Sequence, residues 1–307
     1  MPLRVFPRKT HATPTDGMAY VGYPGLFAPK AEEIHVSVTF TWDLPLAERL
    51  ARAWEPYGRV SIGGPAMGSP GGSFTPGLYL RRGYVITSRG CPNNCWFCSV
   101  PTREGDVREL PITEGWIVQD DNLLACSEPH IRAVFSMLKR QPKRPELRGL
   151  EASFLKPWHV DLLADLRPHQ MFFAYDTPGD LEPLRLAGRM LQEAGFSFSG
   201  RTLRCYVLVG YPGDSTEKAE SRIWQAVEAG FWPFAMLWRD PESGKAPSPW
   251  LRFQKSWDRM AAISATISRR IPHLCPKRSE RPERRGPMRH SVESAALCPC
   301  EPPVRCL

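Results

Sequence analysis

Between residues 84 and 240, short strand-like and longer helix-like segments alternate at intervals of about thirty residues. The strand-like runs are 84–87, 115–122, 147–154, 170–176, 203–209 and 233–238. Helical spacing follows at 127–140, where Ser127 is the expected N-cap, and at 157–166. Strands separated by such helices pair in parallel through right-handed crossovers. The alternation therefore predicts an α/β fold built on a parallel sheet.

A smaller unit precedes this alternation. Residues 1–34 are rich in Pro, Gly and small polar residues and show neither period, which predicts an irregular arm. The residues that follow predict a strand at 34–40, a helix at 44–54 and a strand at 60–62. We therefore expect residues 1–82 to hold the arm and a small, truncated Rossmann-like β-α-β unit.

Three cysteines are clustered in residues 91–98, which read Cys-Pro-Asn-Asn-Cys-Trp-Phe-Cys. Proline and paired asparagines favour a tight non-helical loop, which can wrap a small inorganic body. A cubane iron–sulfur cluster normally takes four thiolates, so a loop with three leaves one iron open to chemistry. A zinc site would need a fourth ligand, and Cys126 and His130 follow in no recognisable zinc spacing. Zinc and three unrelated buried cysteines remain the alternatives.

The spacing Cys-x3-Cys-x2-Cys, with Phe97 before the last cysteine, resembles the signature of the radical S-adenosylmethionine (SAM) superfamily. The resemblance implies a [4Fe-4S] cluster on Cys91, Cys95 and Cys98, with SAM on the fourth iron and Phe97 against its adenine. It also implies the fold, an open (βα)6 partial TIM barrel over residues 83–268 that ends in a C-terminal helix. The match covers about half of the chain.

The resemblance further implies an activity. The reduced cluster splits SAM to methionine and a 5′-deoxyadenosyl radical, which takes hydrogen from a substrate. A reductant protein of the flavodoxin or ferredoxin type is then an expected partner. The substrate is unknown, with a nucleotide or RNA among the alternatives.

Polar residues at the expected strand ends are further candidates. Asp120-Asp121-Asn122 resembles the Asp-Asp-Asn after the second strand in methylthiotransferase-like and cobalamin-type branches of the superfamily. That resemblance gives Asp121 a catalytic role and places it with Asn122 in the SAM or substrate pocket; capping of the next turn is the alternative. Glu151 and Ser153 would point together into the barrel lumen and bind SAM, or Glu151 would form a structural ion pair.

Three more candidates come from the fourth and fifth strands. Tyr175 and Asp176 end the fourth strand, where they would contact substrate or quench a radical, with a plain turn as the alternative for Asp176. Arg204 would pair with the SAM carboxylate, or lie on the surface. Gly210 opens a Gly-Tyr-Pro-Gly turn that resembles the family motif whose backbone packs on adenine, and glycine permits that close approach.

Other classes of protein stay open. A methyl- or methylthio-transferase acting on RNA or protein would need a target-binding module, and a non-catalytic metal-binding protein associated with nucleic acid would bind no SAM. The turn Gly63-Gly64-Pro65 resembles one in cobalamin-binding domains, but the cobalt-ligating motif Asp-x-His-x-x-Gly is absent from the sequence, so cobalamin is not expected.

Charge and hydropathy limit the partners. The formal charge is +8, of which residues 269–307 carry +5, so the body of the chain is only mildly basic. That basic segment, rich in Pro, Arg and Cys, predicts a disordered tail, and truncation after Arg270 should leave iron content unchanged. No apolar run approaches the roughly 20 residues of a membrane span, so we expect a cytoplasmic protein without a membrane partner.

Overall fold

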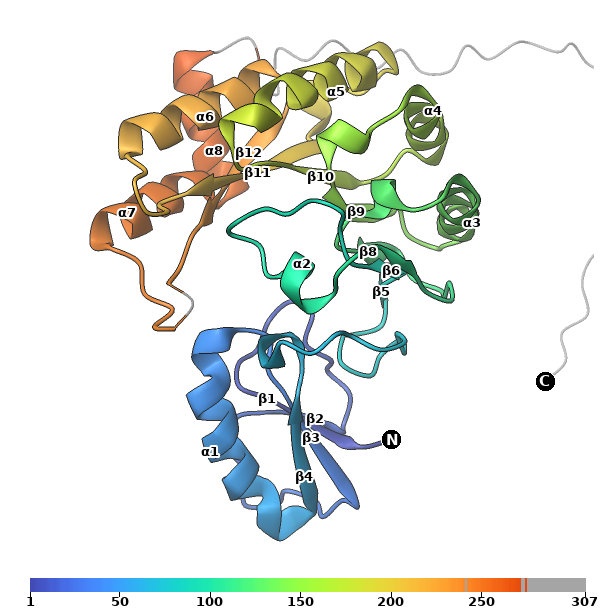
Figure 1. The fold of residues 1–307 in the computed structure, drawn as a ribbon, viewed down its shortest axis with the longest axis vertical. Coiled ribbons are helices and arrows are strands. Elements are labelled where there is room, and N and C mark those ends of the chain that lie inside the picture. Colours follow the sequence, from blue (N-terminus) through green and yellow to red (C-terminus); the bar gives the residue numbers. More distant parts are fainter. Residues whose placement is uncertain (241, 272–273, 275–307) are drawn as a thin grey trace, which may run out of the picture.

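The computed structural model describes residues 1–240, 242–271 and 274. These residues form two main parallel sheets, each with its own hydrophobic core (Figure 1). The larger sheet has the strand order β12-β11-β10-β9-β8-β5, and its neighbouring strands run parallel. The predicted α/β class is therefore confirmed.

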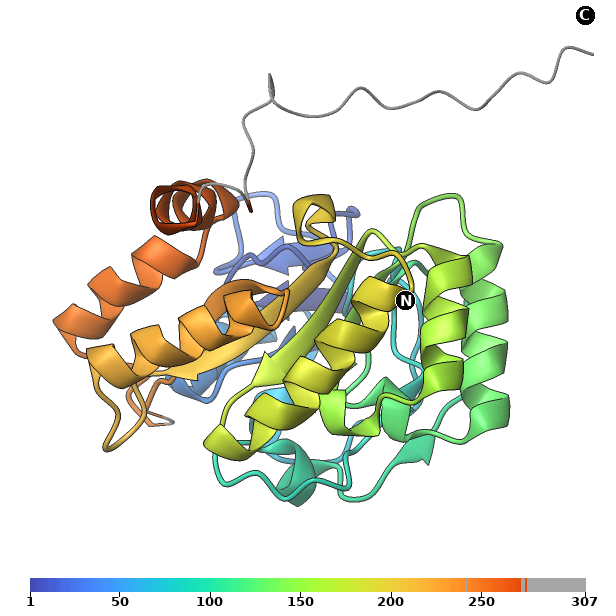
Figure 2. The same ribbon diagram turned by 90° about the horizontal axis from the view of Figure 1, so that it is seen from above.

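The larger sheet carries strands in the order in which they occur along the chain. They are β5 (Tyr84–Val85), β8 (Ile117–Gln119), β9 (Glu146–Leu150), β10 (Gln170–Tyr175), β11 (Leu203–Val209) and β12 (Trp232–Leu237). The connections from β8 onward contain α3 (Glu128–Lys139), α4 (Pro157–Leu166), α5 (Leu181–Glu193) and α6 (Thr216–Glu228). These helices cover one face of the sheet, and the N-terminal unit lies on the other side (Figures 1 and 2). Strands β5 and β12 form its two edges.

Local sequence signals explain where these helices begin. The side chain of Ser127 caps α3 as predicted, accepting a hydrogen bond from the amide of His130 at 3.4 Å.

Two further helices, α7 (Ser248–Trp257) and α8 (Met260–Arg270), follow β12. The expected C-terminal helix is thus a pair, and Trp257 is buried against Trp224 of α6.

The smaller sheet contains two strands that the sequence did not predict. Its order is β2-β1-β3-β4, made of β1 (Leu3–Phe6), β2 (Ala19–Val21), β3 (Glu33–Ser37) and β4 (Arg59–Gly63), with α1 (Leu44–Trp54) between β3 and β4. The β-α-β unit is present, but the prediction of an irregular arm is wrong for β1 and β2. All four residues of β1 are buried, including Arg4, so this central strand shows no alternation that a period search could detect.

Hydrogen bonds join the N-terminal unit to the linker before β5. The Arg4 guanidinium donates to the carbonyls of Gly77 and Leu78 at 3.0 and 2.9 Å, and it pairs with Asp16. The amide of Arg81 donates to the carbonyl of Ala12 at 2.8 Å. The smaller sheet is therefore fixed to the chain that enters the larger one.

The segment between β5 and β8 is irregular apart from three short elements. Strands β6 (Ser88–Arg89) and β7 (Arg108–Glu109) pair antiparallel, and α2 (Val100–Arg103) lies between them. Among the described residues, no helix is both long and apolar enough to cross a membrane. The expected disorder of the tail concerns residues that lie, apart from 269–271 and 274, outside the described part of the chain.

Candidate functional site

The clustered cysteines lie on the loop that joins β6 to α2, beyond the carboxyl end of the first strand of the larger sheet. Cys91, Cys95 and Cys98 are all partly buried. The amide of Cys98 donates to the carbonyl of Cys95 at 3.0 Å, and the amide of Val100 donates to the Cys98 Sγ at 3.5 Å. Figure 2 shows α2 at the side of the sheet toward which the arrow of β10 points. The thiols therefore lie where parallel strands present their polar ends.

Asp120 fixes the start of this loop. Its carboxylate is 5% exposed and accepts hydrogen bonds from the Thr87 amide at 2.7 Å, the Thr87 hydroxyl at 2.6 Å and the Ser88 hydroxyl at 2.8 Å. These three bonds account for a buried carboxylate that would otherwise be costly. Asp120 therefore connects the end of β8 to the start of β6 through hydrogen bonds.

The next two residues contact the cysteine loop directly. Asp121 Oδ2 accepts from the amide of Gly90 at 2.9 Å, and Asn122 Nδ2 donates to Cys91 Sγ at 3.4 Å. Asn122 is 1% exposed, and its Oδ1 is buried without a hydrogen-bond partner among the described residues. The structure therefore brings the predicted Asp121 and Asn122 to the cysteines, with one amide oxygen left unsatisfied.

Acidic side chains from two other strand ends act electrostatically on Cys95. The pKa of Cys95 is raised to about 11, by burial first and then by the charges of Cys98, Cys91, Asp176 and Glu151. Burial raises the pKa of Asp176 to about 7, and the neighbouring carboxylates of Asp180 and Glu151 add to the shift. The pKa of Glu151 is also raised, mainly by burial. These shifts show that the charged forms of these side chains are disfavoured at this end of the sheet, and a bound cation would stabilise them.

Neither Glu151 nor Asp176 has a cationic partner of its own: across the described part of the chain, no Lys, Arg or His nitrogen comes within 4 Å of either carboxylate. Arg222 acts electrostatically on Asp176 but donates to Asp214 Oδ2 at 2.7 Å and to the carbonyl of Leu208 at 3.0 Å. The structural ion pair considered for Glu151 is therefore not formed.

The structure corrects the positions of Glu151 and Ser153. Strand β9 ends at Leu150, and both residues belong to the turn of η5 (Ala152–Phe154), where Glu151 Oε1 accepts from the amide and hydroxyl of Ser153 at 3.3 Å. The strand ends early because Gly149 has φ +69° and the register shifts there; a Cβ on it would lie 2.0 Å from the carbonyl oxygen of Asp120. Their shared direction is thus set by a turn.

Tyr175 points away from the cysteines, contrary to the expected catalytic role. Its ring is 2% exposed in the core, and its hydroxyl donates to Gln225 Oε1 of α6 at 2.6 Å. Side chains alternate between the two faces along a strand. Because Tyr175 lies on the helix-covered face, the next residue, Asp176, lies on the opposite side at the strand end. Tyr175 is a core residue, and the prediction that it contacts substrate is corrected.

Aromatic side chains link the cysteine loop to the turn after β11. The ring of Trp96 lies edge-on to Phe97 with 5.4 Å between centroids, and edge-on to Tyr211 at 5.6 Å. Trp96 is 62% exposed. Sequence reasoning missed Trp96 and Tyr211, although the aromatic pair inside the cysteine motif was a signal for such a contact.

Gly210 has a packing reason for lacking a side chain. It adopts φ +78°, and a Cβ there would lie 2.8 Å from Leu237 Cδ1 and 2.9 Å from Trp250 Cδ2. Its amide donates to Asp214 Oδ2 at 2.9 Å. The close approach expected for a ligand is thus made by side chains of the protein.

Arg204 lies at the opposite end of the sheet from the cysteines. It is the second residue of β11, and its guanidinium stacks over Phe172 and Phe234 at 5.3 and 5.4 Å from the ring centroids. Strand β11 continues to Val209 before it reaches the carboxyl end. We therefore correct the assignment of Arg204 to the SAM carboxylate.

The donor chemistry of the loop fits an iron–sulfur cluster. Among the described residues, no three His, Cys, Asp or Glu side chains converge as placed on a point that could hold one metal ion. A cubane cluster distributes its thiolates over separate irons, so it does not require such convergence. The Asn122 and Val100 contacts to sulfur are the type of hydrogen bond that tunes a bound cluster. Coordination to iron also deprotonates thiols outright, which removes the obstacle of a raised thiol pKa.

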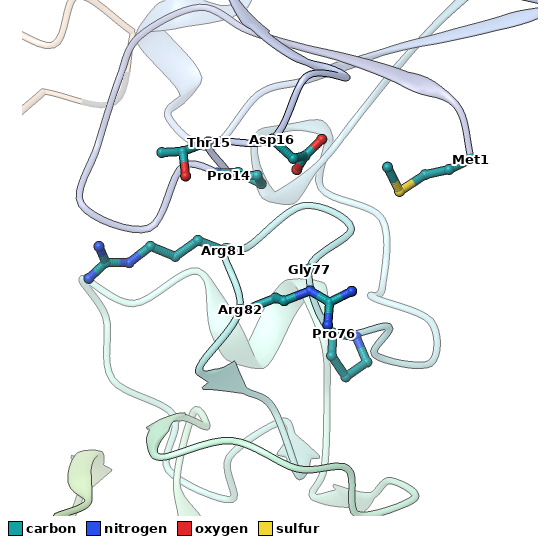
Figure 3. A pocket seen from close by; sticks show the side chains of 8 residues that line it. All are labelled: Met1, Pro14, Thr15, Asp16, Pro76, Gly77, Arg81 and Arg82. Atoms are coloured by element: carbon teal, nitrogen blue, oxygen red, sulfur yellow. The ribbon is translucent and has the colours of Figure 1, made fainter. Parts of the chain in front are cut away.

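A pocket of about 380 Å³ lies elsewhere, between the N-terminal unit and the linker before β5 (Figure 3). It is lined by Met1, Pro14, Thr15, Asp16, Pro76, Gly77, Arg81 and Arg82. Figure 3 shows the side chains of Arg81 and Arg82 extending in opposite directions, so they do not converge on one anion. None of the predicted site residues lines this pocket.

No protein-family model matches the chain, and a comparison with curated proteins found no match. The functional argument therefore depends on the residues of the site itself.

Proposed function

We propose that this chain is a radical SAM enzyme, and one observation carries the proposal. Cys91, Cys95 and Cys98 have the spacing of that superfamily and lie on a loop after the first strand of a parallel sheet. The unpaired acids Glu151 and Asp176 belong to the same end of the sheet. A thiol triad next to unneutralised carboxylates suits a cluster and a cationic cosubstrate better than it suits an inert core.

We also infer that the larger sheet is an open (βα)6 partial barrel. Its six strands follow chain order from β5 to β12, and the edge strands do not pair with each other. Consecutive parallel order is typical of barrels, while the unpaired edges would leave one side open to substrate.

In this proposal the cysteines hold a [4Fe-4S] cluster that, when reduced, supplies the electron that splits SAM to methionine and a hydrogen-abstracting 5′-deoxyadenosyl radical. The reductant would be a protein of the flavodoxin or ferredoxin type. Glu151 and Asp176 accept hydrogen bonds from the ammonium or ribose hydroxyls of SAM, because both carboxylates lack a cationic partner in the part of the chain that the structure describes.

The other residues of the site hold and shield these groups. Asn122 orients Cys91 through its Nδ2 and keeps its Oδ1 for a donor on the cosubstrate. Phe97 and Trp96 provide apolar faces beside the loop, against which an adenine can stack.

Iron incorporation tests the proposal. The anaerobically reconstituted protein should contain about four irons per chain and lose nearly all of them in Cys95→Ala, because a cluster needs all three thiolates. Cys126→Ala is the matched control, since Cys126 is a partly buried thiol outside the loop. Stoichiometric zinc in place of iron, or equal iron in the two variants, would refute the proposal.

A further inference from the structure

The two faces of the larger sheet differ across β10, β11 and β12. On the helix-covered face, Cys205 and Val207 are fully buried. On the other face Arg204, Tyr206 and Phe234 are only partly buried, and Met236 is 44% exposed. Parallel sheets are normally covered on both faces. A half-exposed face made of aromatic and guanidinium groups therefore requires an explanation.

The side chains on this open face form one stacked cluster. The rings of Phe172 and Tyr206 stack with 4.7 Å between centroids, and Phe234 lies 6.0 Å from Phe172. The Arg204 guanidinium lies over Phe172 and Phe234, and Arg148 lies over Phe172 at 5.8 Å. Such stacking fixes the planes of both guanidinium groups while it leaves their edges free to donate hydrogen bonds.

The cluster carries a net positive charge, because Arg148 and Arg204 share one nearby carboxylate, Glu146, which acts electrostatically on both. Arg148 pairs with Glu146 at 3.3 Å. Arg204 donates only to the carbonyl of Arg201, at 3.3 Å, and in the described part of the chain no carboxylate oxygen lies within 4 Å of its guanidinium. The Nε of Arg148 is also buried without a hydrogen-bond partner among the described residues. Partly buried guanidinium groups without an anion are the donors that carboxylates and phosphates bind.

We propose that the open face of β10–β12 binds an aromatic oxyanion, with its carboxylate or phosphate on Arg204 and its ring on Tyr206, Phe234 and Met236. Guanidinium planes interleaved with rings match both parts of such a molecule, whereas a simple anion would use only one.

The position of Arg204 also indicates how long a ligand must be to reach the cysteine loop. Arg204 is five residue steps from Val209, which at about 3.3 Å per residue is roughly 16 Å below the carboxyl end of β11. A molecule of that length would reach from Arg204 toward the cysteine loop. The suggestion that this ligand belongs to the substrate class of the enzyme rests on the proposed function. The binding of an aromatic oxyanion to this face does not depend on that function.

Calorimetric titration of the full-length protein with phenyl phosphate tests the binding. This probe carries an aromatic ring and a phosphate and no other binding group. We expect it to bind at least tenfold more tightly than inorganic phosphate or benzyl alcohol, which each lack one of its two parts. Arg204→Gln should weaken its binding tenfold or more, while Arg189→Gln, on an exposed position of α5, should leave it unchanged.

A second variant covers the case in which Arg204→Gln does not fold. Met236→Glu adds a carboxylate at an exposed position of the same face and should also weaken phenyl phosphate binding tenfold. Equal affinity in the wild type and these variants, or no binding at millimolar probe, would overturn the inference. If instead the probe binds as expected but the protein takes up no iron, the proposed function fails while this binding site stands.

Discussion

The N-terminal unit and the carboxyl end of the larger sheet treat their buried charges differently. In the N-terminal unit, Arg4 is fully buried and pairs with Asp16, and Asp43 is 4% exposed and pairs with Arg8. At the carboxyl end of the larger sheet, Glu151 and Asp176 are partly buried and have no such partner among the described residues, and their pKa values are raised.

This difference separates charges that are paired within the fold from charges that the proposed function assigns to a ligand. A buried ionised group without a partner destabilises the folded state, so it persists where something else, such as catalysis or binding, requires it. Arg222 illustrates the point, since it lies close enough to affect Asp176 but is committed to Asp214.

The largest effect on stability should come from Arg222→Met. The Arg222–Asp214 pair is buried on both sides, with 8% and 0% of the side chains exposed, so the change leaves a buried carboxylate unpaired. We expect a loss of about 3–5 kcal/mol in the free energy of unfolding, measured by urea denaturation. Arg59→Met, at an N-terminal pair with Glu33 whose side chains are 75% and 45% exposed, should cost only about 1 kcal/mol. Equal losses would show that burial does not set how much an ion pair contributes to the stability of this protein.

Carboxylates in the two regions should differ in their effect on SAM binding, which Glu151→Gln tests. Removing a carboxylate that accepts a charge-assisted hydrogen bond from SAM should weaken SAM binding by about 10–100-fold, measured by equilibrium dialysis of the reconstituted protein. Glu33→Gln, in β3 of the N-terminal unit, should leave SAM binding unchanged. A similar affinity in both variants would place SAM elsewhere.

The pH dependence of stability should report Asp176. Its pKa is about 7 in the folded protein against an ordinary 3.8, so between these values the folded state binds more protons than the unfolded state. The free energy of unfolding therefore falls as pH rises through this window, and Asp176→Asn removes that contribution. The urea midpoints at pH 5 and pH 8 should differ less in the variant than in the wild type. An equal difference would show that the pKa of Asp176 is not raised in the folded protein.

The smallest effect is expected from the tail. Ile271 and Leu274 pack against the core, so the cut belongs after Leu274 and not after Arg270. Truncation there should leave iron content and SAM cleavage unchanged. Loss of about half of the iron would show that cysteines beyond the cut bind a second cluster.

The sequence predicted the positions of helices and strands better than it predicted which way their side chains point. The helix at 44–54 and the strand at 203–209 are α1 and β11 with the same bounds, because periodicity and caps are local properties. The short β6–β7 pair was missed, since its formation depends on pairing with a distant segment.

The candidate site was predicted in part for the same reason. The cysteine spacing and the Asp121–Asn122 pair depend on local sequence, and the structure brings them together. Tyr175 was misassigned because strand period gives two faces without saying which one the helices cover, and Arg204 because it lies at the amino end of β11. The position of Glu151 was wrong because the turn at Gly149 is a tertiary feature.

The most direct test of the central claim is formation of 5′-deoxyadenosine. Anaerobically reconstituted protein, given SAM and dithionite, should release 5′-deoxyadenosine and methionine in equal amounts, measured by liquid chromatography with mass detection. The Cys126→Ala control should do the same, and Cys91→Ala, Cys95→Ala and Cys98→Ala should release none. Absence of 5′-deoxyadenosine from protein that carries about four irons per chain would contradict the account.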